Sequence, residues 1–246
     1  MVMIAHVSDI HIDAGERAAE RTARVVRYLA ALPIPPDAVV VTGDLAEHGA
    51  EAEYERVREL LDLNVPVLYC PGNHDSREPY RKALLGEDAG GDGPDDRAYE
   101  IGGVLILMID SSIPGRDDGW LADETLAWLD ATLAGRAELP ALICFHHPPV
   151  TLGMPFPDSI RQFGAERLAV VVERHPQVVA LLCGHAHTPA ATTFAGRPLI
   201  AAPGVVSTSM LPYETDEVVD LTSPPMIAIH LLDDERRLVT HYRVIS

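Results

Sequence analysis

The sequence predicts an α/β fold with mixed parallel and antiparallel sheets, and two patterns along the chain support this prediction. Over most of the chain, short apolar runs typical of buried strands alternate with longer segments whose apolar residues recur at helical spacing. Such alternation favours a sheet with helices packed on its faces. Towards the C-terminus several strand-like segments follow one another without an intervening helix, which favours antiparallel pairing there.

The strand-like runs are nearly continuous in apolar residues, as expected for strands that are covered on both faces. Five such runs span residues 3–7, 38–41, 65–70, 141–145 and 178–183. The later strand-like segments span residues 190–195, 199–201, 226–232 and 237–244. Helical periodicity occurs over residues 15–32, 50–61, 123–134 and 165–174, between strand-like runs.

A polar cluster follows each of the first five apolar runs. The clusters are Asp9-Ile10-His11, Gly43-Asp44, Gly72-Asn73-His74-Asp75, His146-His147 and Gly184-His185-Ala186-His187. Ligands of open α/β sheets bind beyond the carboxyl ends of the strands, so these clusters are expected to converge on one rim. Carboxylate, amide oxygen and imidazole are ligands that suit a hard or borderline divalent ion, and no cysteine is among them. The clusters therefore predict a metal site.

Each cluster taken alone has an ordinary structural interpretation. Asp9 and His11 fit a turn at the end of a strand, and Asp44 after a glycine fits a turn or a helix N-cap. Two imidazoles spaced as His185 and His187 lie on the same side of an extended segment, which is weak evidence by itself. Because all five clusters occur at predicted strand ends of one chain, the metal site is the better interpretation.

Composition favours one domain over residues 1–246. The chain is 47% hydrophobic, enough for a large core, and no long linker or repeat divides it. The N-terminus has no basic leader and the chain has no apolar segment of spanning length, which predicts a cytoplasmic protein without membrane insertion. Cys70, Cys144 and Cys183 lie within apolar runs and are expected to be buried free thiols.

The charge balance bears on the class of partner. Lys and Arg number 19 against 37 Asp and Glu, which gives a formal net charge of −18 and disfavours a large nucleic acid. A small anionic substrate remains compatible, because divalent ions at the predicted metal site would offset the negative charges of Asp9 and Asp44.

The ordered series Asp-x-His, Gly-Asp, Gly-Asn-His-Asp, His-x-Pro and Gly-His-x-His resembles the calcineurin-like metallophosphoesterases, with no motif missing. Within that superfamily the chain looks most similar to class III cyclic-nucleotide phosphodiesterases and bacterial glycerophosphodiesterases. This closer resemblance rests on residues 6–11, 110–112, 119–129 and 146–149. The resemblance extends from Met3 to about Tyr213, and it implies a four-layer αββα sandwich.

The resemblance also implies the ligand roles. One metal ion would be held by Asp9, His11, Asp44 and His187, and the other by Asp44, Asn73, His146 and His185, with Asp44 as the bridge. The ions would be divalent transition metals, either Mn, Fe or Zn.

The resemblance also implies which residues near the metals would meet the substrate. Asn73 and His74 would contact it, and His74 would serve the leaving oxygen as general acid or charge stabiliser, with Asp75 orienting its ring. For His147 two roles are open, either contact with substrate or support behind the ligands.

The activity implied is hydrolysis of small phosphodiesters, such as cyclic nucleotides or glycerophosphodiesters, by a hydroxide shared between the two metals. A phosphomonoesterase and a non-catalytic scaffold are the alternatives. His48 stands where the phosphoprotein phosphatase branch has an arginine that neutralises a dianion, which favours a monoanionic diester.

Two stretches predict loops. Residues 86–97 are rich in Gly and Asp, whereas residues 203–225 carry four prolines and few apolar anchors. The second stretch leaves the predicted sheet soon after His187, so it is expected either to overhang the metals or to form an oligomer contact. Related enzymes are often dimers or larger assemblies, so the resemblance implies a homo-oligomer as one option.

Overall fold

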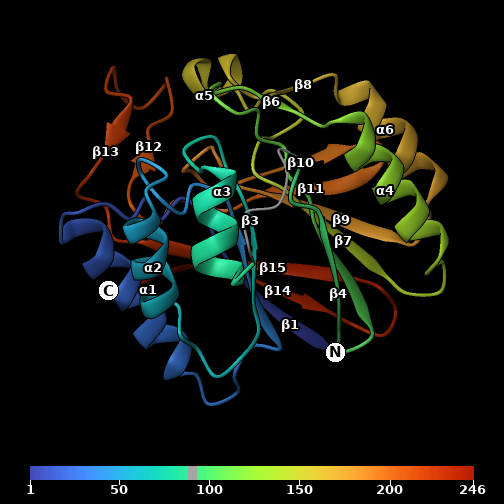
Figure 1. Ribbon diagram of the computed structural model, residues 1–246, viewed down its shortest axis with the longest axis horizontal. Coiled ribbons are helices and arrows are strands. Elements are labelled where there is room, and N and C mark those ends of the chain that lie inside the picture. The colour runs from blue at the N-terminus through green and yellow to red at the C-terminus, as the bar shows by residue number, and fades with distance from the viewer. Residues whose placement is uncertain (88–92) are drawn as a thin grey trace.

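Two β-sheets stacked face to face form the centre of the fold, with helices on both outer sides (Figure 1). The computed structural model describes residues 1–87 and 93–246. Part of the predicted loop at 86–97 therefore lies outside the described residues. The layers confirm the predicted αββα arrangement, whereas the assignment of residues 1–246 to a single domain stays a prediction.

The first sheet has five strands in the order β15-β14-β1-β2-β3. Its parallel half consists of β1 (Val2–Val7), β2 (Ala38–Thr42) and β3 (Val67–Cys70). Its antiparallel half adds β14 (Met226–Leu232) beside β1 and then β15 (Leu238–Val244) at the edge. The antiparallel pairing of β14 with β15 agrees with the prediction from their lack of an intervening helix, whereas the place of β14 beside β1 was not predicted.

The second sheet has six strands in the order β10-β11-β9-β7-β5-β4. Its four inner strands are parallel: β5 (Val104–Met108), β7 (Ala141–Cys144), β9 (Val178–Cys183) and β11 (Arg197–Ala201). The two edge strands, β4 (Arg97–Ile101) and β10 (Ala190–Phe194), pair antiparallel with their neighbours. The hairpin of β4 and β5 lies outside the predicted strand ranges, although the apolar run of β5 is a strand signal.

Helices lie on the outer face of each sheet. On the five-stranded side are α1 (Arg17–Ala30), α2 (Glu51–Leu60), α3 (Arg77–Tyr80) and a π-helical turn, η1 (Arg81–Leu85). On the other side α4 (Asp123–Ala134) and α6 (Ala165–Arg174) cover the six-stranded sheet, and both match their predicted ranges (Figure 1).

Short elements lie at the end of the sheets where the parallel strands terminate (Figure 1). They are helix α5 (Pro155–Ser159), the parallel pair of β6 (Gly119–Trp120) with β8 (Gln162–Phe163), and the antiparallel pair of β12 (Thr208–Ser209) with β13 (Val219–Asp220).

Strand alternation divides the core into three layers. On β1, Ile4 faces the other sheet, whereas Ala5 and Val7 pack against the helices. Facing Ile4 across the sandwich are residues such as Ile106 of β5 and Leu182 of β9. Each fully buried aliphatic side chain contributes about 1.5–3 kcal/mol, so this central layer holds the two sheets, and the rim between them, in a fixed relation.

Two further sequence predictions can be compared with the fold. Cys70, Cys144 and Cys183 are all buried and free, which confirms the prediction for the thiols. Among the described residues, no helix combines the length and apolar character that crossing a membrane requires.

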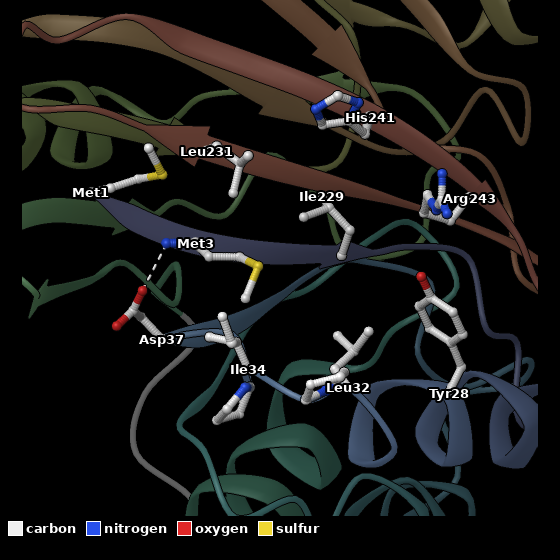
Figure 2. Close-up of a pocket in the computed structure, with 12 residues that line it drawn as sticks. Met1, Met3, Tyr28, Leu32, Ile34, Asp37, Ile229, Leu231, His241 and Arg243 are labelled. Atoms are coloured by element: carbon white, nitrogen blue, oxygen red, sulfur yellow. Dashed lines mark hydrogen bonds between the residues drawn. The ribbon is translucent and has the colours of Figure 1, made fainter.

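The outer face of the five-stranded sheet carries an apolar recess of about 730 Å³ (Figure 2). In Figure 2, Ile229 of β14 lies opposite Leu32 beyond the end of α1, and Met3 lies beside Ile34. Its lining contains none of the predicted metal ligands. The chemistry predicted from the sequence must therefore be sought elsewhere, at the rim between the sheets.

Candidate metal centre

All five polar clusters meet at one rim, as the fold of parallel strands requires. Asp9 follows β1, Asp44 follows β2 and Asn73 follows β3, all from the first sheet. His146 follows β7 and His185 follows β9, from the second sheet. Backbone hydrogen bonds join the loops within each sheet: His11 N donates to Asp44 O at 2.9 Å, and Gly184 N donates to His146 O at 3.0 Å.

The ligand loops have an unusual backbone. Among residues 1–87 and 93–246, seven non-glycine residues have a positive φ, and five of them are predicted ligands. These five are Asp9 (54°), His11 (45°), Asp44 (50°), His185 (67°) and His187 (50°). A left-handed conformation costs a side-chain-bearing residue about 1–2 kcal/mol and persists only where surrounding contacts enforce it. The concentration of this strain at the predicted ligands marks the rim as a functional site.

Gly72 lets two of these loops approach each other closely. A Cβ atom at this position would lie 2.2 Å from Asp44 Oδ1 and 2.5 Å from Asp44 N. Because both neighbours belong to a buried loop, a side chain at position 72 would push the Asn73 loop away from Asp44.

The first predicted ligand set is brought together. The ligand atoms of Asp9, His11, Asp44 and His187 all lie within 4.8 Å of one another. His11 Nε2 is 3.2 Å from His187 Nε2 and 3.5 Å from Asp44 Oδ2, and His187 Nε2 is 3.4 Å from Asp9 Oδ1. The resulting cluster of two imidazoles and two carboxylates matches the set expected for one metal.

The second predicted ligand set surrounds His146 Nε2. Asp44 Oδ2 lies 3.3 Å from this nitrogen, Asn73 Oδ1 lies 3.2 Å from it, and His185 Nδ1 lies 3.2 Å from it. Asp44 Oδ2 therefore faces both sets, as a bridging ligand must.

The convergence of lone pairs in these sets fits a bound cation. His146 donates its Nδ1 proton to Thr42 O at 2.8 Å, so a neutral His146 ring turns the Nε2 lone pair towards the oxygens of Asp44 and Asn73. His11 likewise donates from Nδ1 to Glu47 Oε2 at 2.7 Å and turns Nε2 towards the centre. Electron-rich atoms this close repel one another unless a positive charge lies among them.

The electrostatics lead to the same conclusion. Burial lowers the pKa of His146, but the adjacent Asp44 carboxylate outweighs burial and raises that pKa to about 9, so without a metal ion a proton on Nε2 supplies the positive charge that these ligand atoms need, and a metal ion would displace that proton. Burial opposes ionisation of Asp44, yet His146 holds the pKa of Asp44 well below its usual range. Burial lowers the pKa of His185 to about 3, so this ring is neutral, which is the form that binds metal. Its buried Nε2 has no hydrogen-bond partner within the described part of the chain.

Outer partners fix the ligating rings. His11 is held by Glu47 and His146 by the Thr42 carbonyl, while His187 Nδ1 is 2.8 Å from Ser207 Oγ. In each ring this contact leaves Nε2 for the centre, which is how proteins commonly orient metal-binding histidines. The sequence interpretation did not include Glu47. Its signal was its place three residues after Asp44, on the loop that follows β2.

His147 lies behind the centre. Its side chain is buried, its Nδ1 is 2.9 Å from Ser111 Oγ, and its Nε2 donates to Asp117 O at 3.2 Å. A ring with no exposed surface cannot meet a substrate in this conformation. Of the two roles left open by the sequence, the geometry favours support of the neighbouring ligand His146.

His74 lines the recess at the centre, but Asp75 does not act as predicted. His74 donates from Nδ1 to Glu47 O at 2.9 Å. The Asp75 carboxylate instead accepts four hydrogen bonds, from the backbone N–H groups of residues 45, 46 and 72 and from the Tyr54 hydroxyl. The expectation that Asp75 orients the His74 ring is therefore wrong, because the backbone of two loops and the Tyr54 hydroxyl already occupy both oxygens of this half-buried carboxylate.

A recess of about 360 Å³ opens over the centre. His11, Asp44, Asn73, His74, His185 and His187 line its floor. Its walls come from two groups of residues: Asp117, Phe156, Pro157 and Ile160, which lie on two separate segments, and Ser207, Ser209, Val218 and Val219. The second group belongs to the 203–225 stretch, which thus lies at the mouth of the site.

No fixed cation lies in this recess. Among the described residues that line it there is neither lysine nor arginine. His48, which occupies the arginine position of the phosphatase motif, has a largely exposed ring that binds Glu53 Oε1 at 2.9 Å. The described lining of the recess therefore contains no forked arginine clamp for a phosphoryl group.

Comparison with known proteins agrees with the fold and the site. A family model described as calcineurin-like phosphoesterase matches residues 2–189. The chain therefore belongs to the calcineurin-like phosphoesterase family.

Two similar proteins and one solved structure give more detail on this family membership. The glycerophosphodiester phosphodiesterase GpdQ of Enterobacter lignolyticus is 35% identical over 250 residues, which cover 93% of this chain and 86% of that protein. The 3',5'-cyclic adenosine monophosphate phosphodiesterase CpdA of Pseudomonas aeruginosa is 30% identical over 243 residues, covering 96% and 87%. Among solved structures, a dimetal phosphatase of Danio rerio has the same fold, with a TM-score of 0.77, 17% identity and coverage of 100% and 96%.

Proposed function

We propose that this chain hydrolyses small phosphodiesters with the help of two divalent transition-metal ions, Mn, Fe or Zn. The observation that carries this proposal is the position of Asp44 Oδ2 between two sets of inward-facing ligand atoms. The sequence similarity to proteins named as glycerophosphodiester and cyclic-nucleotide phosphodiesterases supports the same activity.

The proposed ligand assignment follows the two sets. Asp9, His11, Asp44 and His187 would hold one ion, and Asp44, Asn73, His146 and His185 would hold the other. When bound, such ions lower the pKa of water at their site and neutralise charge on the phosphoryl oxygens. The protein supplies these ligands from loops whose backbone is strained at five of the seven ligand residues.

His74 is the proposed acid for the leaving oxygen. Its side chain is about one third exposed, and the hydrogen bond from Nδ1 to Glu47 O orients the ring. In the imidazolium form both ring nitrogens carry protons, so Nε2–H can protonate or hydrogen-bond to an alkoxide that leaves from the recess. Asn73, next to it on the same loop, would help to orient the phosphoryl group.

The shape and charge of the recess favour a monoanionic diester over a dianionic monoester. The turned-away His48 leaves no arginine-like clamp for the additional charge of a monoester. The exposed aromatic ring of Phe156 and the aliphatic Val218 and Val219 offer apolar walls to the organic groups of a diester. A phosphomonoesterase remains the second candidate.

We also propose a cytoplasmic location, because three buried free thiols suit a reducing compartment. A homo-oligomeric assembly stays a prediction.

The test is a panel of matched substrates after reconstitution with Mn²⁺. We expect kcat/KM for bis(p-nitrophenyl) phosphate to exceed that for p-nitrophenyl phosphate at neutral pH. Cyclic AMP and glycerophosphocholine, measured in the same series, separate the two named kinds of diester. Faster monoester cleavage throughout would replace the diesterase proposal by the phosphatase one, and elemental analysis showing one equivalent of metal at full activity would reject the two-metal centre.

A further inference from the structure

Two buried histidines lie in the otherwise apolar layer between the sheets. His6 of β1 and His230 of β14 have no exposed surface, although their neighbours on the same face include Ile4 and Leu232. A polar group without partners is costly in such a layer, so the partners of these rings need an explanation.

The two rings form the middle of a hydrogen-bonded chain that crosses four adjacent strands. Thr240 Oγ1 of β15 lies 2.8 Å from His230 Nδ1, and His230 Nε2 lies 3.1 Å from His6 Nδ1. His6 Nε2 is 2.8 Å from Thr42 Oγ1 of β2. The Thr42 hydroxyl donates to Ser8 Oγ at 2.9 Å, and Ser8 Oγ donates to the Thr42 carbonyl at 2.9 Å.

The hydroxyl hydrogen bonds at the Thr42 end set the direction of the protons along this series of hydrogen bonds. The single hydroxyl proton of Thr42 goes to Ser8, so His6 must donate from Nε2 to Thr42 Oγ1. A neutral His6 then accepts at Nδ1 from His230 Nε2–H, and His230 accepts at Nδ1 from Thr240. Burial lowers the pKa of His6 well below its usual range and that of His230 to about 3, which keeps one proton on each ring.

This series of hydrogen bonds ends at the proposed metal centre. The Thr42 carbonyl, which accepts from Ser8, also accepts the Nδ1 proton of His146 at 2.8 Å. Ser8 immediately precedes Asp9, and Thr42 lies two residues before Asp44. At Gly184 a Cβ atom would lie 1.9 Å from Ser8 Oγ and 2.6 Å from the Thr42 carbonyl oxygen, so the loop of the second sheet packs directly on this end.

We propose that the chain Thr240–His230–His6–Thr42–Ser8 positions the metal ligand His146, by fixing the carbonyl that holds its ring and the strand ends that carry Asp9 and Asp44. His6 and His230 are thus positioning residues for the centre. The inference rests on the metal assignment proposed above. The family model matches residues 2–189, so His230 and Thr240 lie outside it. The end of the hydrogen-bonded series that is distant from the metal centre therefore belongs to the C-terminal strands.

The first test exchanges the residue at the joint of the chain. Thr42→Val keeps the shape but removes the hydroxyl, whereas Thr42→Ser keeps the hydroxyl but removes a methyl group. We expect Thr42→Val to weaken binding of one of two Mn²⁺ equivalents by about 10-fold, the lower end for loss of an outer hydrogen bond to a metal site, and Thr42→Ser to stay within about twofold. Calorimetric titration of the metal-free protein measures both, and circular dichroism confirms folding.

A packing role predicts the opposite order, because Val fills the space of Thr and Ser does not. Binding by Thr42→Val that equals or exceeds binding by Thr42→Ser therefore overturns the proposal. If the parent protein binds no second Mn²⁺, the metal assignment itself fails. The NMR measurement below then tests the hydrogen-bonded series independently of metal binding.

The second test reads the ring tautomers in the metal-free protein by ¹⁵N NMR. In Ser8→Ala the Thr42 hydroxyl loses its acceptor and can be satisfied only by donating to His6 Nε2. We expect the His6 and His230 protons to move from Nε2 to Nδ1 together, whereas Thr240→Val, which removes the donor at the far end, leaves both on Nε2. Unchanged tautomers in Ser8→Ala overturn the inference that the metal end sets the direction of the chain.

Discussion

Replacement of Asp75 by Asn tests whether this carboxylate clamps two loops or serves His74. Each Asp75 oxygen accepts two hydrogen bonds: Oδ1 from Ala46 N and the Tyr54 hydroxyl, and Oδ2 from Leu45 N and Gly72 N. An Asn side chain replaces one of these oxygens by an amino group, which faces two donors and can accept from neither.

The loss can be estimated from these contacts. Hydrogen bonds to a charged group contribute about 1.5–3 kcal/mol each, so losing two destabilises the fold by about 3–6 kcal/mol. For a chain of this length, each kcal/mol lowers the melting temperature by about 2–4 °C, which gives an expected drop of about 6–24 °C. Because Gly72 and Leu45 flank the Asn73 and Asp44 loops, metal binding should weaken as well.

Thermal unfolding of metal-depleted protein, followed by circular dichroism, measures the stability term without interference from the ions. His74→Asn serves as the comparison, since it changes the neighbouring residue without touching the Asp75 contacts, and we expect it to keep the parent melting temperature. An Asp75→Asn protein that melts with the parent but loses turnover to the same extent as His74→Asn would restore the catalytic role for Asp75 and refute the clamp.

Three further predictions concern the centre. His74→Ala should keep both metals, as measured by elemental analysis, and lower kcat by roughly 10²- to 10⁴-fold, because only a positioned acid is removed; turnover equal to the parent would contradict its role. Asp44→Ala should lose metal and activity together, since both ligand sets share its carboxylate; retention of two equivalents in the same analysis would exclude the bridge. Glu47→Gln should weaken the metal held by His11 by about 10- to 100-fold in a calorimetric titration, because the carboxylate that accepts from His11 Nδ1 becomes a neutral amide; unaltered affinity would show that Glu47 does not support the ligand.

The ligand set could be predicted from the sequence because its signal is local. Asp9, Asp44 and His146 each stand two residues after the end of a buried strand, and parallel strands bring such positions to one edge. Residue type and place along the chain were therefore sufficient to expect the ligands to meet. The helical ranges at 123–134 and 165–174 were accessible for the same reason, since periodicity is local.

The supporting contacts could not be predicted because they depend on pairings between distant segments. His6 and His230 are 224 residues apart in sequence, and only the register of β14 on β1 brings their rings within 3.1 Å. The prediction for Asp75 failed for a related reason. Asp75 is next to His74 in sequence, but its carboxylate accepts from the backbone N–H groups of residues 45 and 46 on another loop. Adjacency in sequence thus predicted side-chain contacts in loops poorly, whereas position at a strand end predicted well which ligands meet.

The ligands are drawn from both sheets, and this has a consequence for the order of events in folding. His11 and His187 are 176 residues apart in sequence, yet their Nε2 atoms are 3.2 Å apart. The centre therefore exists only after the two halves of the sandwich have docked, and a partly folded chain with one sheet offers an ion only a fraction of its ligands. Ions that bind only the protein with both sheets docked should slow unfolding and leave the rate of refolding nearly unchanged.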